Sequence, residues 1–153
     1  MSAEEKLREL GLTLPPAPAG VGAYVPWVRC GSLVFTSGQL PWREGKLACT
    51  GKLGAGVTVE QGYQAARICA LNALAQLKAA AGDLGAIKQV VRLEGYVHAG
   101  PGFRDHPKVL DGASDLFNAV LGERGRHART ALGINEMPLD AAVQLCVIAE
   151  IGA

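Results

Sequence analysis

The stretch from Thr58 to Gly82 constrains the fold most, because it predicts one long helix that must pack along a single side. Thr58 and Gln61 have the spacing of a capping box, in which each side chain satisfies the free backbone N–H of the other residue. Small or apolar residues then recur at helical spacing, at positions 66, 70, 73, 77 and 80, and Gly82 is a typical C-terminal stop. Because most of these residues are alanine, we expect thin, closely packed layers.

Extended segments lie on both sides of this helix in the chain. The runs "YVPWVRC" and "LVFTSGQLPW" predict a β-hairpin that turns at Gly31-Ser32, and residues 46–49 add a short strand. The β-branched run "IKQVVRLEGYVHA" predicts a strand after the helix. A second helix begins at Pro107 and ends at Gly122, and a short one covers residues 3–10.

The last quarter of the chain predicts a second hairpin, with strands near residues 128–135 and 141–150. The order β-β-(β)-α-β-α-β-β is typical of an α+β domain, in which helices collect on one face of a mixed sheet. The other face then needs a cover. We expect that cover to be another copy of the same chain.

Length and charge narrow the class of protein. The 153 residues predict one domain, 1–153, with residues 1–20 as an N-terminal extension. A net charge of +1 weighs against a nucleic-acid or anionic-membrane surface. No apolar run has the length of a transmembrane helix. The opening "MSAEEKLREL" lacks an apolar signal region, so we expect a cytoplasmic protein.

The cysteines and histidines form no metal-binding pattern. The four cysteines include no C-x-x-C pair, and the three histidines lack ligand spacing. We therefore expect reduced, buried thiols, no metal and no cofactor. Ser37 likewise has no His/Asp partnership in the sequence that would make it a nucleophile.

Arg129 is the residue that stands out in the predicted final hairpin. Alternation places it on one strand face with Ala131 and Gly133, whose small side chains leave room around the guanidinium. If the turn is centred near residues 136–137, Gln144 lies opposite Arg129, and an anion-binding fork then sits beside an amide. The alternative is an edge arginine that is solvated or pairs with an acidic group. His127 is either a second polar contact or a structural hydrogen-bonder.

Three motifs in this order, "FTSGQLPW", "HART" and "MPLDAAVQLCVIAEI", resemble the YjgF/Rid family (RidA-like, also called endoribonuclease L-PSP). The similarity runs from about residue 24 to residue 151, and "GASDLFNAVLGERGRHAR" resembles a longer branch. The best understood members are enamine/imine deaminases. The resemblance implies a chorismate-mutase-like fold, in which a six-stranded sheet carries two helices. Three such sheets pack as a trimeric barrel with sites in clefts between subunits.

The resemblance also implies roles for single residues. An arginine that matches Arg129 binds the substrate carboxylate. A tyrosine and a serine that line the cleft match Tyr24 and Ser37, and Gly38 follows that serine. An asparagine common in the second helix matches Asp111, which we therefore place among the substrate-binding residues.

Gln144 departs from the family pattern. Active deaminases carry a glutamate there, fifteen residues after the arginine, which positions and activates the water that attacks C=N. An amide can orient water but cannot accept its proton. Two hypotheses stay open. One is a deaminase that hydrolyses 2-imino or enamine acids to 2-oxo acids and ammonia, with Gln144 and Ser37 in the catalytic site. The other is a non-catalytic protein that binds a metabolite in the same cleft.

RNA cleavage is a third hypothesis, which the near-neutral charge and the lack of a paired acid and base disfavour. The expected partners are a small carboxylate metabolite, such as a 2-imino or 2-oxo acid, and two further copies of the chain in a homotrimer. No membrane or nucleic-acid partner is expected.

Overall fold

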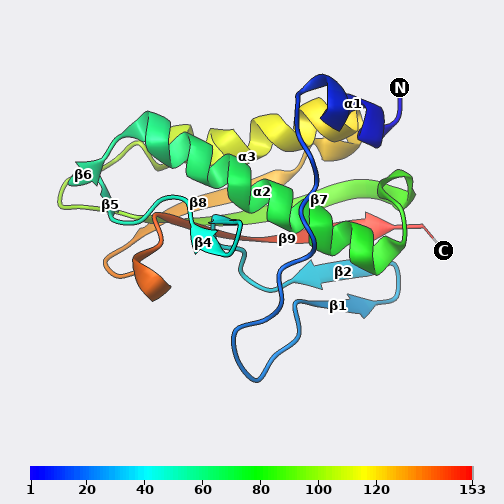
Figure 1. Ribbon diagram of the computed structural model, residues 1–153, viewed down its shortest axis with the longest axis horizontal. Helices are drawn as coiled ribbons and strands as arrows, with labels where there is room; N and C mark the ends of the chain where they lie inside the picture. The colour runs from blue at the N-terminus through cyan, green and yellow to red at the C-terminus, as the bar shows by residue number, and fades with distance from the viewer. Residues whose placement is uncertain (153) are drawn as a thin grey trace.

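A computed structural model describes residues 1–152, in which helices cover one face of a mixed sheet (Figure 1). The main sheet consists of β1 (Trp27–Cys30), β2 (Leu33–Thr36), β7 (Ile87–His98), β8 (Ala128–Ile134) and β9 (Val143–Ile151). Its strand order is β1-β2-β9-β7-β8. Two further two-stranded pairs are formed by β3 (Trp42–Arg43) with β4 (Lys46–Leu47) and by β5 (Lys52–Leu53) with β6 (Gly56–Val57).

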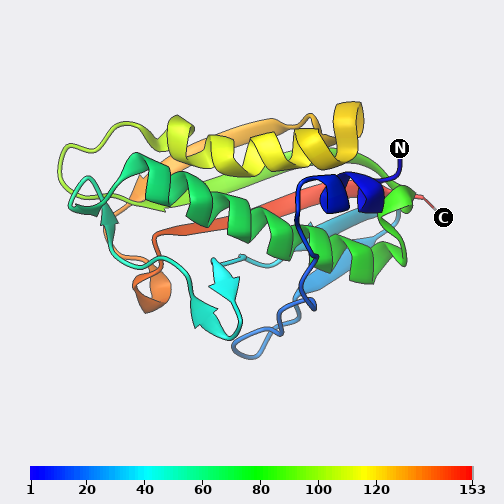
Figure 2. The ribbon, with the colours of Figure 1, turned by 45° about the horizontal axis from the view of Figure 1, so that its top comes forward.

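The helices are α1 (Ala3–Glu9), α2 (Val59–Ala81) and α3 (His106–Leu121), with short 3-10 turns at η1 (Leu84–Ala86), η2 (Gly122–Gly125) and η3 (Pro138–Asp140). Helices α2 and α3 lie side by side over the sheet (Figure 2). The predicted capping box is present: Thr58 Oγ1 accepts from the Gln61 N–H at 3.2 Å, and Gln61 Oε1 accepts from the Thr58 N–H at 2.9 Å. The three predicted helices and the first hairpin are confirmed.

The layers are as thin as the alanine content suggests. A Cβ atom at Gly112 of α3 would overlap the backbone carbonyl of Tyr63 in α2, so glycine is what allows the two helices to approach this closely. Gly95 of β7 similarly leaves space for the Leu110 side chain. That side chain is fully buried, and its burial contributes about 1.5–3 kcal/mol.

The predicted hairpin at the end of the chain is wrong. β8 pairs in parallel with β7, and β9 lies between β2 and β7, where it runs antiparallel to both. The cause is α3, which returns the chain to the starting end of β7, so that the next strand joins the sheet in parallel by a crossover. Residues 135–142 then carry the chain past the end of β7 to the other side of that strand.

Three details of the expected fold also change. The main sheet has five strands instead of the six that the family resemblance implies. The strand expected at residues 46–49 is limited to β4, which pairs with β3 outside the main sheet. The helical layer contains a third helix, because α1 packs Ala3 and Leu7 into the same core as α2 and α3.

The face of the sheet away from the helices, which we call the open face, carries exposed apolar side chains. Val28, Phe35 and Leu132 are 53%, 40% and 52% exposed, and strand register places all three on this face. Alternate residues of β9 point the same way and are half-buried, whereas those between them are fully buried under the helices. The open face therefore exposes apolar side chains on both edge strands of the sheet, β1 and β8, and on β2.

Candidate functional site

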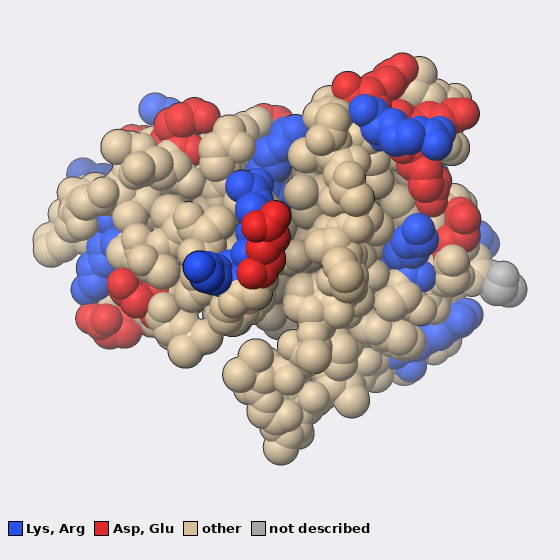
Figure 3. Space-filling view, viewed as in Figure 1, with Lys and Arg blue, Asp and Glu red and all other residues tan. Residues whose placement is uncertain are grey.

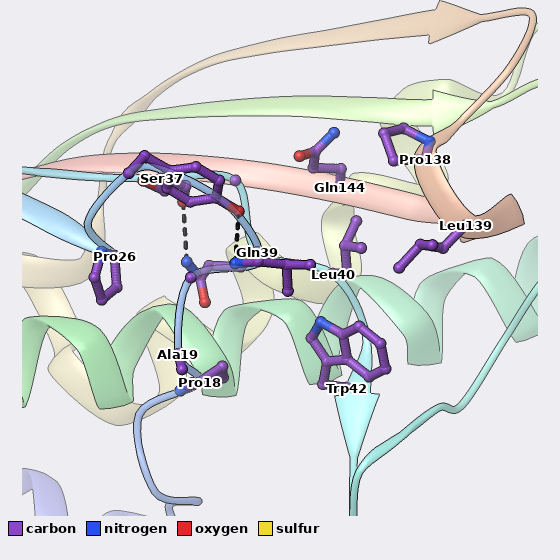
Figure 4. A pocket seen from close by; sticks show the side chains of 14 residues that line it. Pro18, Ala19, Pro26, Ser37, Gln39, Leu40, Trp42, Pro138, Leu139 and Gln144 are labelled. Atoms are coloured by element: carbon purple, nitrogen blue, oxygen red, sulfur yellow. Dashed lines mark hydrogen bonds between the residues drawn. The ribbon is translucent and has the colours of Figure 1, made fainter.

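A cleft of about 380 Å³ lies beside the end of β2, a size typical of small-molecule sites. It is formed by the segment before β1, the loop after β2, the start of β9 and the 3-10 turn η3 (Figure 4). The lining residues are Pro18, Ala19, Gly20, Val21, Tyr24, Pro26, Ser37, Gly38, Gln39, Leu40, Trp42, Pro138, Leu139 and Gln144. None of them carries a charge, so the cleft is uncharged and mainly apolar.

Gly38 and Gln144 are in direct contact in this cleft. The loop after β2 follows β9 through two backbone hydrogen bonds, from Gln39 N to Leu145 O at 2.6 Å and from Leu145 N to Gln39 O at 3.1 Å. This pairing sets Gly38 against the Gln144 side chain so closely that a Cβ atom at Gly38 would overlap Gln144 Oε1. The amide nitrogen of Gln144 donates to Met137 Sδ at 3.6 Å.

Ser37 and Tyr24 also line the cleft, as expected from the family resemblance. The Ser37 hydroxyl donates to the Val25 carbonyl at 2.6 Å, and the Tyr24 hydroxyl accepts from the Val21 N–H at 3.2 Å. A carbonyl cannot take up the serine proton, so this geometry gives Ser37 no base. Its oxygen lone pairs remain able to accept a hydrogen bond from a ligand.

The wall formed by Pro138 and Leu139 is held from behind by His98, which is 1% exposed. His98 Nε2 lies 3.2 Å from the Asn135 carbonyl, and His98 Nδ1 lies 3.5 Å from Asp140 Oδ1. His98 Nδ1 has no hydrogen-bond partner among residues 1–152, so the Nε2 contact with Asn135 and the bond from the His98 N–H to the Ala142 carbonyl at 2.9 Å are what tie the wall segment to the end of β7. The wall is therefore a fixed part of the cleft.

Arg129 does not lie in this cleft, and the expected meeting of Arg129 with Gln144 within one chain is wrong. Gln144 pairs with Tyr96 of β7, which pairs in turn with Leu132 of β8, three residues along from Arg129. The two strands are two spacings apart, about 10 Å. Arg129 pairs with Leu93, which faces the helices, whereas Gln144 is on the open face. Strand β7 thus separates the two side chains.

Asp111, Ser114 and Pro107 of α3 hold the Arg129 side chain. Nη1 donates to Asp111 Oδ1 at 2.8 Å and to Ser114 Oγ at 3.1 Å, and Nη2 lies 3.4 Å from the Pro107 carbonyl. A guanidinium has five N–H donors, so these three bonds leave capacity for a ligand. Within one chain, Arg129 is therefore an edge arginine paired with an acidic group, which was the alternative that the sequence left open. Asp111, expected among the substrate-binding residues, pairs with the arginine.

His127 lies behind this group and is a structural hydrogen-bonder. Its Nδ1 is 2.6 Å from the Gly125 carbonyl and its Nε2 is 2.9 Å from Ser114 Oγ. Because the carbonyl only accepts, we assign the proton to Nδ1, and Nε2 then accepts from the Ser114 hydroxyl. Burial lowers the pKa of His127, the bond to Gly125 opposes that shift, and the nearby Arg129 charge adds to it.

Sequence reasoning missed part of the site. Asp111 and Ser114 are three residues apart in α3 and so share its face toward β8, a spacing that could have pointed to Ser114. Nothing in the sequence indicated the cleft walls at Pro18–Val21 and Leu139. Within residues 1–152, no group of three or more His, Cys, Asp or Glu side chains is placed to hold a metal. No helix in that range is long and apolar enough to cross a membrane.

The sheet and its helices are those of the small α+β proteins with a chorismate-mutase-like fold, and comparison with known proteins agrees. The sequence model of the family described as "YjgF/chorismate mutase-like, putative endoribonuclease" matches residues 4–151. The chain belongs to this YjgF family.

Three known proteins illustrate the similarity of this chain to others in sequence and in structure. Protein TCP17 of Trypanosoma cruzi is 44% identical over 146 residues, which are 95% of this chain and 91% of that protein. A solved structure of a "putative endoribonuclease" from Shewanella oneidensis is 45% identical, with a TM-score of 0.96 over 99% of this chain and 100% of that one. Escherichia coli TdcF, solved with bound serine, shares the fold at 23% identity, with a TM-score of 0.64 over 88% of this chain and 92% of that one.

We predict that His127 makes stability depend on pH. The folded pKa is lowered, so the unfolded chain takes up the proton first as pH falls below about 6.5. The stabilisation is complete above that pH and is lost as pH falls through the folded pKa. Urea unfolding at pH 8 and pH 5 should show a larger loss for the natural protein than for His127→Gln, whose side chain does not titrate. Equal losses would contradict this role of His127.

Proposed function

We propose that this protein binds a small 2-oxo or 2-imino acid in a cleft shared by two subunits of a homotrimer, and that it hydrolyses imino acids only weakly. The observation that carries the proposal is the contact of Gln144 with Gly38, next to Ser37, in an uncharged cleft. The carboxylate-binding Arg129 lies separately, near the opposite edge of the sheet. Each chain thus offers two complementary halves of a site.

A head-to-tail arrangement of subunits would join these halves. β8 is one edge of the sheet, whereas β2 and the cleft lie toward the other edge, at β1. When one edge of each subunit meets the opposite edge of the next, the contact is heterologous, and it closes into a trimeric ring when each copy is rotated by a third of a turn from the last. The neighbouring subunit's Arg129 would then face Ser37 and Gln144.

The open face supports an assembly of this kind. Val28, Phe35 and Leu132 are exposed on it, and three of its polar side chains, those of Arg92, Glu94 and Thr130, are already bonded to one another. Arg92 Nε lies 3.2 Å from Glu94 Oε1, and Arg92 Nη2 also donates to the Thr130 hydroxyl. Contact between copies would therefore bury apolar area at about 25 cal/mol per Å² without leaving these charges unpaired.

The proposed chemistry follows from these groups. Arg129 holds the ligand carboxylate and directs the adjacent C=N carbon toward Ser37 and Gln144. Water adds to this carbon, ammonia leaves, and a 2-oxo acid remains. Gln144 orients the water, and the proton must pass to solvent or to the leaving nitrogen, since an amide cannot accept it.

Two comparisons bear on this choice of ligand. Serine, bound in the E. coli relative of the same fold, is a small acid with the carboxylate that this proposal requires. An endoribonuclease, the activity in the family description, would need a basic surface for phosphates. The net charge of +1 and the uncharged cleft do not favour that activity.

The assembly gives one prediction. Sedimentation at micromolar concentration should give three times the mass of the chain, and Phe35→Glu should reduce that mass, because it buries a charge on the open face. Leu10→Glu is the matched control, since Leu10 is 41% exposed and Phe35 40%. A monodisperse natural monomer would contradict both the ring and the shared cleft.

Arg129 gives a second prediction. Arg129→Ala should weaken binding of small 2-oxo acids at least tenfold, because a charge-assisted hydrogen bond contributes about 1.5–3 kcal/mol. Titration calorimetry on the folded variant measures the loss. Gly38→Val should also impair binding, since its side chain overlaps Gln144. Mixed trimers of the two variants should recover some binding, wherever an intact Arg129 meets an intact cleft. No recovery would place both residues in the same subunit's site.

Gln144 gives a third prediction. Gln144→Glu should speed ammonia release from freshly generated imino acids by about 10²-fold or more, since general-base help is typically worth about 10²–10⁴-fold. The double variant Asp111→Asn/Gln144→Glu should react no more slowly than Gln144→Glu alone. In the double variant Arg129 faces only one protein carboxylate, the one at position 144. Gln64→Glu, the same change at an exposed helix position, is the control. If the natural protein is already fast and the variant is no faster, Gln144 is not the limiting group.

A further inference from the structure

The segment between α1 and β1, residues 12–24, forms a wall of the cleft and is not a loose tail. We call it the N-terminal strap. It begins at α1, whose Ala3 and Leu7 are 3% and 4% exposed within the core. The strap then crosses α2 and ends in a projecting loop before β1 (Figure 1). Its first part is anchored too, since Leu12 and Leu14 pack against the same core.

Gln76 of α2 fastens the middle of the strap to the cleft. This side chain is 1% exposed, and its Nε2 donates to the Pro18 carbonyl at 2.6 Å. The same nitrogen lies 3.4 Å from Gln39 Oε1, and Gln39 Nε2 donates to the Ser37 carbonyl at 3.0 Å. One buried amide therefore connects the strap to the loop that carries Ser37.

The tip of the strap is packed on itself. The Tyr24 ring lies against Gly20 and Gly22, at which Cβ atoms would come within 3.2 Å and 3.1 Å of ring carbons. The Tyr24 hydroxyl accepts from the Val21 N–H. The tip is thus a shaped wall, built from Pro18, Ala19, Gly20, Val21 and Tyr24.

No charged residue occurs in the strap, and the projecting loop appears as a charge-free lobe in Figure 3. Leu40, Trp42 and Leu139 line the same cleft and are apolar as well. A second carboxylate buried here would lose its hydration without gaining a partner, whereas an aliphatic side chain would gain about 0.8 kcal/mol per CH₂ group removed from water.

We propose that the strap determines which side chain the ligand carries: it selects 2-oxo and 2-imino acids with uncharged, apolar side chains and rejects dicarboxylates. This inference rests on the proposed function for the carboxylate end of the ligand. It assigns the other end of the ligand to residues 18–24, with Gln76 as the positioning residue that holds them.

The test compares two ligands that share the 2-oxo carboxylate: the 2-oxo acid of leucine and the 2-oxo acid of glutamate. The natural full-length protein should bind the first at least tenfold more tightly, as one unpaired charge costs more than about 1.4 kcal/mol. In Val21→Arg, a guanidinium on the wall should pair with the second carboxylate and reduce or reverse that preference. Val21 is 69% exposed, so the substitution leaves the core intact.

Val25→Arg is the matched control. It makes the same change four residues further on, at a side chain that is 56% exposed and does not line the cleft, so the natural preference should persist. Equal binding of the two acids by the natural protein, or an unchanged preference in Val21→Arg, would overturn the role of the strap and leave the proposed function standing. Failure of the natural protein to bind either acid would overturn the proposed function, and the inference with it.

Discussion

The crossover from β7 through α3 to β8 is the constraint on which the arrangement of the site depends. It makes β8 an edge strand and leaves the place between β2 and β7 for β9. Arg129 therefore points toward α3, where Asp111 and Ser114 hold it. Gln144, on β9, is left beside Gly38 at the end of β2. Because β7 lies between the two strands, no change of side-chain rotamer alone could bring Arg129 to Gln144 in one chain. A shared site requires a second subunit.

The main helices and strands and the first hairpin were predictable, but the places of β8 and β9 in the sheet were not. Capping and periodicity are local signals, and they located α2 with its box at Thr58 and Gln61. Strand pairing is not local. The final hairpin was expected because the strands predicted near residues 128–135 and 141–150 are separated by a short turn. In the structure eight residues, 135–142, join β8 to β9, and they are enough to pass the end of β7. The strap was missed because its proline-rich sequence has no period. Tyr24, Ser37 and Gln144, to which the family motifs had pointed, line one cleft in the structure, and their role as a site stays a prediction.

The ion pair of Arg129 with Asp111 would prepare the arginine for the proposed ligand carboxylate. The Arg129 and Asp111 side chains are 22% and 50% exposed, and ion pairs with this much exposure contribute about 0–1 kcal/mol to folding stability. A ligand carboxylate can therefore replace or join Asp111 at little cost. In the ligand-free chain Asp111 and Ser114 keep the Arg129 guanidinium in one orientation, which would reduce the entropy lost when a carboxylate binds. Burial lowers the pKa of His127, which favours the neutral imidazole behind Ser114 over a second positive charge beside Arg129.

Asp111 also gives an electrostatic reason for an amide at position 144. The family resemblance implies an asparagine at the position of Asp111 and a glutamate at that of Gln144, whereas this chain has the acid and the amide exchanged. In either arrangement one protein carboxylate and one ligand carboxylate would share the arginine. Adding a glutamate at position 144 to the present Asp111 would set three anions against a single cation, in a cleft with no other charge. Like charges that close disfavour ionisation. A glutamate at position 144 would therefore be ionised, and so able to take a proton from water, in a smaller fraction of molecules beside Asp111 than beside an asparagine.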